Sequence, residues 1–207
     1  RFVCSVDDFA TLFEQARTAA RVLPDAVVGV APHSLRAATP EELSAVCAMN
    51  PSGPIHIHAA EQVGEVEDCV AWSGQRPVEW LLAHGGVDPR WTLIHATHVS
   101  RTEVEGLAAS GAVAGLCPLT EANLGDGIFP AASYVDAGGR LAVGTDSNIV
   151  IDVSRELEML EYAQRLTHRR RNVLASEDRR STGASLFELA RAGGGQSLGA
   201  PSAGLAA

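Results

Sequence analysis

Short apolar runs alternate with helical segments along this chain, and this alternation constrains the fold more than any other feature of the sequence. Five runs rich in β-branched and apolar residues occur in order: VVGVAP from Val27, IHIHA from Ile55, TLIHAT from Thr92, AVAGLC from Ala112 and LAVGTD from Leu141. Continuous apolar runs are typical of parallel strands that helices cover on both faces. The alternation therefore predicts an α/β fold with a parallel sheet and disfavours a β-sandwich.

Helix-start signals occupy the segments between the runs. Thr39 is followed by a first-turn proline and, three residues on, by Glu42, and Ser100 precedes Glu103 by the same spacing. We expect helices at residues 7–23, 39–48, 77–84, 100–111, 131–137 and 153–168. Residues 118–127 are rich in turn-forming residues and are expected to form a loop.

The chain is too short for a closed eight-stranded barrel. Such a barrel takes about 250 residues, whereas this chain has 207 residues, begins in a helical pattern and ends in Gly- and Ala-rich sequence. We expect an incomplete barrel whose missing strands precede Arg1, and a doubly wound open sheet is the alternative. Residues 1–192 are assigned to the partial barrel, and residues 193–207 to the start of a connection to a missing C-terminal segment.

Composition excludes several classes of partner. The formal charge is −9 and hydrophobic residues make up 46% of the chain, which fits a soluble globular domain and disfavours nucleic acid as a partner. No apolar run is long enough to span a membrane, so no membrane partner is expected. The cysteines lie far apart and form no Cys-x-x-Cys motif, which predicts reduced thiols in a cytoplasmic protein.

Ionisable side chains end or follow four of the five apolar runs. They are His33 and Arg36 after the first run, His58 and Glu61 at the second, His95 at the third and Asp146 at the fifth. A single histidine at a strand end is more often a hydrogen-bonded structural residue. In a barrel, however, these positions share the C-terminal end of the strands, where active sites form. Imidazole and carboxylate groups together are the ligands of a catalytic ion such as Zn²⁺, so the sequence predicts a metal-dependent active site.

The stretch IHIHAAEQ has two interpretations when it is taken alone. It fits a His-x-His pair at the first strand of a metal-dependent barrel, and it also fits a His-x-x-Glu motif at the fifth strand. The order of HxxE from His58, IHATH around His95 and GTDSN around Asp146 resembles strands five, six and eight of the amidohydrolase superfamily. This resemblance implies a (β/α)₈ barrel of the TIM type, with strands four to eight in this chain and the first-strand His-x-His outside it.

The same resemblance implies roles for the residues at the strand ends. His58 and Asp146 would be ligands of Zn²⁺ or a similar divalent ion. His95 and Asp146 would handle the proton of the attacking water, and Glu61 would pass protons to the departing nitrogen. His56 lies on the same face as His58 and is interpreted as a packing or supporting residue rather than a ligand.

Within the superfamily, the motifs APHSLRA, HIHAAEQ, CPLTEANLGDG and GTDSN together most resemble the formimidoylglutamate deiminases. That resemblance implies hydrolysis of N-formimidoyl-L-glutamate to N-formyl-L-glutamate and ammonia, a step of histidine degradation. His33 and Arg36 would bind the substrate, since a fixed guanidinium suits a small dicarboxylate. In the alternative interpretation, Arg36 is a surface residue that pairs with Glu41 or Glu42 at a helix start.

Other functions remain open at this stage. Deaminases of guanine or S-adenosylhomocysteine, and imidazolonepropionase, share the His, His and Asp positions. A different class is a non-catalytic barrel fragment or an interaction module. The 207 residues alone are expected to be inactive, and the complete protein is expected to act on a small molecule as a homodimer.

Overall fold

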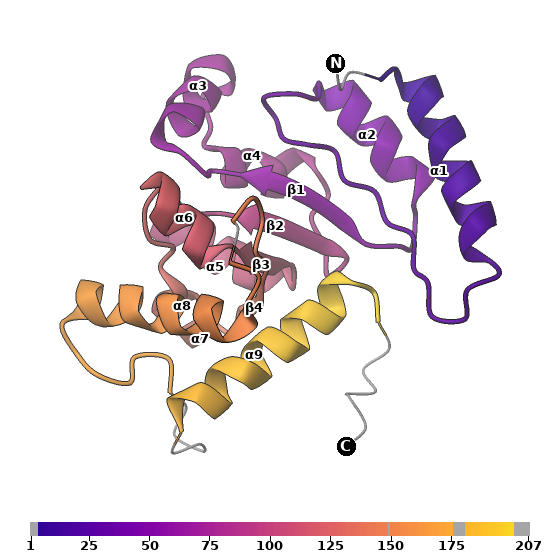
Figure 1. Ribbon diagram of the computed structural model, residues 1–207. Coiled ribbons are helices and arrows are strands. Elements are labelled where there is room, and N and C mark those ends of the chain that lie inside the picture. Colours follow the sequence, from indigo (N-terminus) through magenta and orange to yellow (C-terminus); the bar gives the residue numbers. More distant parts are fainter. Residues whose placement is uncertain (1–3, 149, 176–180, 201–207) are drawn as a thin grey trace.

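Four parallel strands form the centre of the molecule (Figure 1). The computed structural model describes residues 4–148, 150–175 and 181–200. The strands are β1 (Ile55–Ala59), β2 (Trp91–His95), β3 (Val113–Leu116) and β4 (Arg140–Val143), and they pair in chain order. Each neighbouring pair is parallel, with Ala59 opposite His95 and Leu116 opposite Val143. The predicted α/β fold with a parallel sheet is confirmed.

The first apolar run lies along the free edge of β1 without forming a regular strand. Two isolated bridges join it to β1, one between Val30 and Ile55 and one between Ser34 and His58. Pro32 lies between the bridges and has no amide hydrogen to donate, so the ladder is interrupted there. The fourth barrel strand is therefore present as two bridges rather than as a continuous ladder.

Helices connect the strands and flank the sheet. Within the described residues they are α1 (Val6–Ala20), α2 (Pro40–Met49), α3 (Val63–Ser73), α4 (Pro77–His84), α5 (Arg101–Ser110), α6 (Pro118–Leu124), α7 (Ala131–Asp136), α8 (Val153–His168) and α9 (Thr182–Ser197). The expected helices are confirmed, with ends shifted by at most three residues. The capping boxes predicted at Thr39 and Ser100 both form. None of the described helices combines the length and the apolar character needed to cross a bilayer.

Three helices, α3, α6 and α9, were not predicted from the sequence. The N-cap residue of α3, Gln62, makes no side-chain capping hydrogen bond, so this helix lacks the usual start signal. Helix α6 has only seven residues and lies in the stretch expected to be a loop. Helix α9 contains glycines at 193–195, which have poor helix propensity, and its packing against β3 and β4 outweighs that preference. Helix α9 also runs across the expected boundary at residue 193, and residues 201–207 lie outside the described residues.

The two faces of β1 carry different kinds of side chain. Ile55, Ile57 and Ala59 are fully buried, whereas His56 and His58 alternate with them and remain partly exposed on the other face. The apolar face belongs to one core that extends through the neighbouring strands and helices. The histidine face is consequently the face that a barrel would turn toward its interior.

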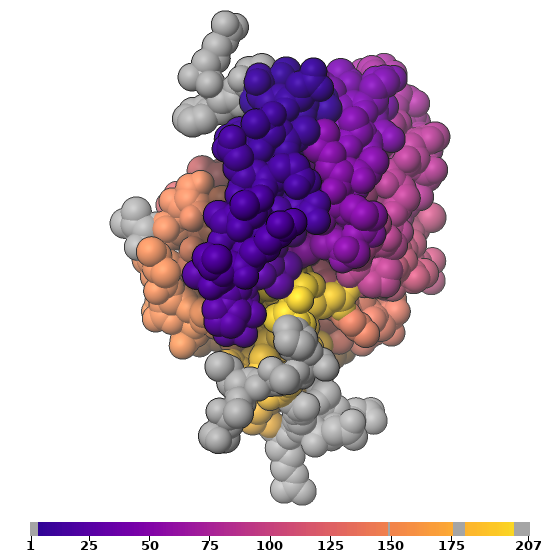
Figure 2. All heavy atoms as spheres, turned by 90° about the vertical axis from the view of Figure 1, so that its right-hand side faces the viewer, coloured from indigo at the N-terminus to yellow at the C-terminus, as the bar shows by residue number. Residues whose placement is uncertain are grey.

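Helix α9 fastens the beginnings of the strands. The Nε2 amide of Gln196 donates to the carbonyl oxygens of Pro89 and Gly111, each at 2.8 Å, immediately before β2 and β3. The His56 ring donates through Nε2 to the carbonyl oxygen of Ser197 at 2.8 Å, which fits the packing role expected for His56. Figure 2 shows the yellow end of α9 against the violet segment that precedes β1, where Gly199 lies close to Val27 and Pro54.

The four cysteines, Cys4, Cys47, Cys69 and Cys117, are free thiols.

Gly193 is the closest point of contact between α9 and the sheet. A Cβ atom at this position would lie 1.8 Å from the carbonyl oxygen of Leu141 in β4. A Cβ atom on Gly194, the next residue of the helix, would meet no atom within 4 Å. Glycine is therefore required at the first position for backbone packing, while it only lowers helix propensity at the second.

We predict that Gly193→Ala and Gly194→Ala change stability in opposite directions. Gly193→Ala should lower the free energy of unfolding by about 1 to 3 kcal/mol, because α9 must move away from β4. Gly194→Ala should raise it by up to about 1 kcal/mol through helix propensity. Urea unfolding of the two variants checks this, and a shift of both variants in the same direction would contradict the assigned packing.

Candidate active site

The carboxyl ends of β1, β2 and β4 lie at the same edge of the sheet and lead into unusual backbone conformations. Ala60, His95, Ala96 and Asp146 all adopt positive φ angles, between 48° and 67°. Residues with side chains pay an energetic penalty in this region, and such residues cluster at functional sites when the surrounding structure holds them there. The strained positions thus coincide with the strand ends that the sequence analysis identified.

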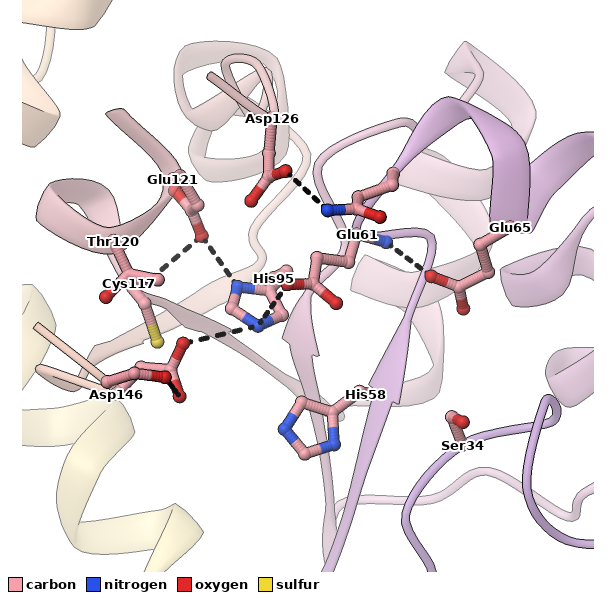
Figure 3. A network of polar contacts seen from close by, with 12 residues as sticks. Ser34, His58, Glu61, Glu65, His95, Cys117, Thr120, Glu121, Asp126 and Asp146 are labelled. Atoms are coloured by element: carbon pink, nitrogen blue, oxygen red, sulfur yellow. Dashed lines mark hydrogen bonds and ion pairs between the residues drawn. The ribbon is translucent and has the colours of Figure 1, made fainter. Parts of the chain in front are cut away.

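His95 lies at the centre of a network of carboxylates (Figure 3). Its ring is 1% exposed, and Nδ1 donates to Glu121 Oε1 at 3.2 Å. On the other side of the ring, Nε2 is 3.7 Å from Glu61 Oε1 and 4.0 Å from Asp146 Oδ2. The predicted convergence of His95, Glu61 and Asp146 is therefore present. Because Nδ1 holds the proton in the neutral ring, the lone pair of Nε2 faces the other two carboxylates.

The carboxylates determine how His95 titrates. Burial lowers the pKa of His95, but the hydrogen bond and charge of Glu121, with the charges of Glu61 and Asp146, outweigh burial and raise the pKa above its ordinary value. The surrounding carboxylates therefore favour a proton on this ring despite its burial. A group with this property is suited to proton transfer.

His58 is oriented by the segment that runs along the edge of β1. Its Nδ1 donates to the carbonyl oxygen of His33 at 2.8 Å, which leaves the Nε2 lone pair available as a ligand. A hydrogen bond from one ring nitrogen to a carbonyl is the usual support for a metal-binding imidazole. The ring centroids of His58 and His95 are 5.7 Å apart, and those of His58 and His33 are 4.9 Å apart.

Arg36 faces the active-site end instead of the helix start. Its Nη2 atom is 3.2 Å from Glu61 Oε2 and 3.8 Å from Glu65 Oε2. The alternative pairing of Arg36 with Glu41 or Glu42 is not found, since Glu42 caps Thr39 and the guanidinium points the other way. Arg36 is 39% exposed at its side chain, so a ligand can reach it.

Two supporting residues were missed in the sequence analysis. Glu121 and Glu65 are buried carboxylates that hold His95 and the turn before Glu61, respectively. Both lie four residues after a strand-end position, Cys117 for Glu121 and Glu61 for Glu65. This spacing is the only signal that could have identified them, because an isolated glutamate in a helical pattern normally predicts an exposed face.

The loop that follows α6, residues 125–127, is hydrogen-bonded to segments that follow β1 and β2. Gln62 Nε2 donates to Asp126 Oδ1 at 3.0 Å, and His98 Nε2 donates to the carbonyl oxygen of Asp126 at 2.7 Å. At Gly127, with φ of 140°, a Cβ atom would lie 3.1 Å from both His98 and Thr97. The loop is therefore held close against the end of β2, beside the candidate site.

The donor groups of the site fit a divalent metal ion in chemical kind. The Nε2 atom of His58 lacks a hydrogen in the arrangement described above, and Asp146 offers carboxylate oxygens. Among the described residues, no three His, Cys, Asp or Glu side chains already form a group that could hold a metal. The fit is consequently one of ligand chemistry alone.

Comparison with known proteins agrees with this geometry. Residues 4–193 match the amidohydrolase family, so the chain belongs to that family. It is 47% identical to formimidoylglutamate deiminase of Pseudomonas aeruginosa over 207 residues, which are 100% of this chain and 46% of that protein. It is 32% identical to 5-methylthioadenosine/S-adenosylhomocysteine deaminase of Natronomonas pharaonis over 197 residues, which are 90% of this chain and 44% of that protein. The chain thus spans about half the length of these relatives.

Solved structures confirm the fold. A crystal structure of an amidohydrolase from Brucella melitensis has a TM-score of 0.96 and 55% sequence identity, with 100% of this chain and 46% of that chain covered. An adenosine deaminase from Xanthomonas campestris with bound zinc has a TM-score of 0.85 and 26% sequence identity. The match covers 96% of this chain and 45% of that chain. The four strands, with the bridged edge segment, therefore belong to a (β/α)₈ barrel of the amidohydrolase kind, in which the chain represents strands four to eight.

We predict that Glu121→Ala lowers the pKa of His95 in metal-free protein, because the ring stays buried while its nearest negative charge is removed. The folded pKa of His95 is raised, so this contribution to stability is complete below the unfolded pKa of about 6.5 and is lost as the pH rises through the folded pKa. The variant should therefore lose more stability at pH 5 than at pH 8.

NMR titration of the imidazole and urea unfolding at the two pH values measure these effects. Glu103→Ala is the control, since Glu103 is equally buried but contacts Arg76 rather than His95. An unchanged His95 pKa in Glu121→Ala would show that the Glu121 contact does not govern this ring.

Proposed function

We propose that the protein to which these 207 residues belong hydrolyses N-formimidoyl-L-glutamate to N-formyl-L-glutamate and ammonia. The observation that carries the proposal is the convergence of Glu61, His95 and Asp146 at the carboxyl ends of the strands, with Arg36 beside Glu61. The 47% identity to formimidoylglutamate deiminase over all of this chain supports the same substrate. A cytoplasmic setting and a place in histidine degradation are part of the proposal.

The proposed reaction adds water to the formimino carbon and releases its terminal nitrogen as ammonia. His58 and Asp146 would hold a divalent ion, for which zinc is the proposed identity. When bound, such an ion lowers the pKa of a coordinated water molecule and so provides a nucleophile near neutral pH. His95 and Asp146 would accept a proton from the attacking water, and the carboxylates that raise the pKa of His95 suit it to this role. Glu61 carries protons to the departing nitrogen.

Substrate binding is assigned to His33 and Arg36. The guanidinium of Arg36 can form two parallel hydrogen bonds with a carboxylate of the substrate, which an ammonium group could not do with the same geometry. The substrate carboxylate would compete with Glu61 and Glu65, which share this guanidinium in the structure. His33 is exposed and lies three residues before Arg36, and its ring is hydrogen-bonded to the Ser34 hydroxyl at 2.9 Å.

We predict that Glu61→Gln abolishes most of the turnover without loss of bound metal. A general acid or base typically contributes about 10² to 10⁴ in rate, so the kcat for ammonia release should fall by that factor. The assay uses the full-length protein with N-formimidoyl-L-glutamate, and elemental analysis reports the metal. Glu105→Gln is the control, because Glu105 is exposed and pairs only with Arg101 among the described residues.

The same assay separates the alternatives. Near wild-type turnover in Glu61→Gln would reject the proton-transfer role of Glu61. Faster turnover of guanine or S-adenosylhomocysteine by the wild-type protein would reject the formimidoyl substrate while leaving the deaminase chemistry in place. Absence of turnover with all of these substrates would favour the non-catalytic class.

We predict that Arg36→Ala weakens substrate binding through the loss of a charge-assisted contact. A hydrogen bond to a charged group contributes roughly 1.5 to 3 kcal/mol, so kcat/KM should fall by about one to two decades, mainly through KM. Steady-state kinetics check this, with Arg101→Ala as the control for loss of an exposed arginine. Unchanged kinetics would show that Arg36 has only a structural role.

A further inference from the structure

Glu65 holds the backbone that carries Glu61. The Glu65 side chain is 2% exposed and lies in the first turn of α3. Its Oε1 atom accepts the amide hydrogen of Ala60 at 3.0 Å, and its Oε2 atom accepts that of Glu61 at 2.9 Å. A glutamate at this helix position normally reaches back to the N-cap amide. Here it reaches beyond the N-cap residue, Gln62, to the two residues before it.

The turn that Glu65 holds is strained and lies at the end of β1. Ala60 has a φ of 52° and is fully buried. This conformation turns the amides of Ala60 and Glu61 toward the Glu65 carboxylate, as Figure 3 shows for the Glu61 amide. Without that carboxylate the turn would lose both hydrogen bonds, and a residue with a side chain would relax out of the left-handed region.

The Glu61 side chain is held from a second direction. Arg36 Nη2 is 3.2 Å from Glu61 Oε2 and 3.8 Å from Glu65 Oε2, so one guanidinium lies between the two carboxylates. The other oxygen of Glu61, Oε1, remains 3.7 Å from His95 Nε2. Backbone and side-chain contacts together thus aim Glu61 Oε1 at the reacting side of His95.

We propose that Glu65 is a positioning residue that acts through Glu61, by fixing the turn at the end of β1 from which Glu61 reaches His95. This inference rests on the proposed function, in which Glu61 carries protons. Positioning of a catalytic group by about 1 Å can change a rate by about 10²-fold, so a residue that never contacts the substrate can still control turnover.

Glu103 provides a matched control because it has the same kind of structural role but contacts none of Glu61, His95 and Asp146. It is 3% exposed and accepts the amide hydrogens of Ser100 at 2.7 Å and Glu79 at 3.2 Å. It also pairs with Arg76 at 2.6 Å. A purely structural loss should therefore affect Glu65→Gln and Glu103→Gln alike.

The test is a double-mutant cycle in the full-length protein. Glu65→Gln should lower kcat about 10- to 100-fold with KM changed less than about threefold, while Glu103→Gln leaves both within about twofold. Because Glu65 acts through Glu61, adding Glu65→Gln to Glu61→Gln should lower the residual kcat no further. Hydrogen exchange measured on peptides covering residues 60–62 should accelerate in Glu65→Gln and stay unchanged in Glu103→Gln.

Three outcomes would overturn the inference. They are additive losses of kcat in the cycle, equal losses in Glu65→Gln and Glu103→Gln, and unchanged exchange at residues 60–62 in Glu65→Gln. Failure of the proposed function gives a different result, namely no ammonia release from N-formimidoyl-L-glutamate by the wild-type protein. In that case the cycle is run with whichever deaminase substrate is turned over. If none is, a role for Glu65 in catalysis is rejected, and exchange reports only on the turn.

Discussion

Parallel pairing of β1 and β2 in one register is the constraint on which the candidate site depends. With Ala59 opposite His95, the chain leaves both strands at the same edge of the sheet. Glu61, two residues beyond β1, then reaches the ring of His95 at the end of β2. A shift of the pairing by one residue would turn every side chain of one strand to the opposite face of the sheet. The apolar core opposes such a shift, because it requires Ile57 and Leu93 to stay buried on the same face of the sheet.

Buried carboxylates organise the surroundings of the site, and each has specific partners. Glu121 contacts His95 and the Cys117 amide, Glu65 accepts two amides before α3, and Glu156 accepts the amide of Leu119 at the start of α6. Burial of an unpaired charge would be costly, so these contacts are needed for the fold as well as for the site. Burial raises the pKa of Glu156, with the Leu119 hydrogen bond opposing the shift and the charge of Glu121 adding to it.

Local signals explain how much could be predicted from the sequence. The parallel sheet and the convergence of Glu61, His95 and Asp146 could be predicted, because apolar periodicity and strand-end position are properties of short segments. The roles of Glu65 and Glu121 could not, because they depend on contacts formed only when strand and helix are placed together. Helix α9 was missed for a related reason: its glycines weaken the local helical signal, and the role of Gly193 lies in its contact with a strand far away in the sequence.

The contacts of α9 have a consequence for how this half-barrel can change during evolution. Gln196, His56 and Gly193 join the beginnings of the strands, whereas Glu61, His95 and Asp146 lie where the strands end. The length of the strands separates these two groups of residues. Substitutions in the loops at the reacting end can accordingly alter substrate preference while the cross-links at the opposite end preserve the scaffold. This separation of scaffold contacts from reacting residues allows one architecture to serve enzymes with different substrates.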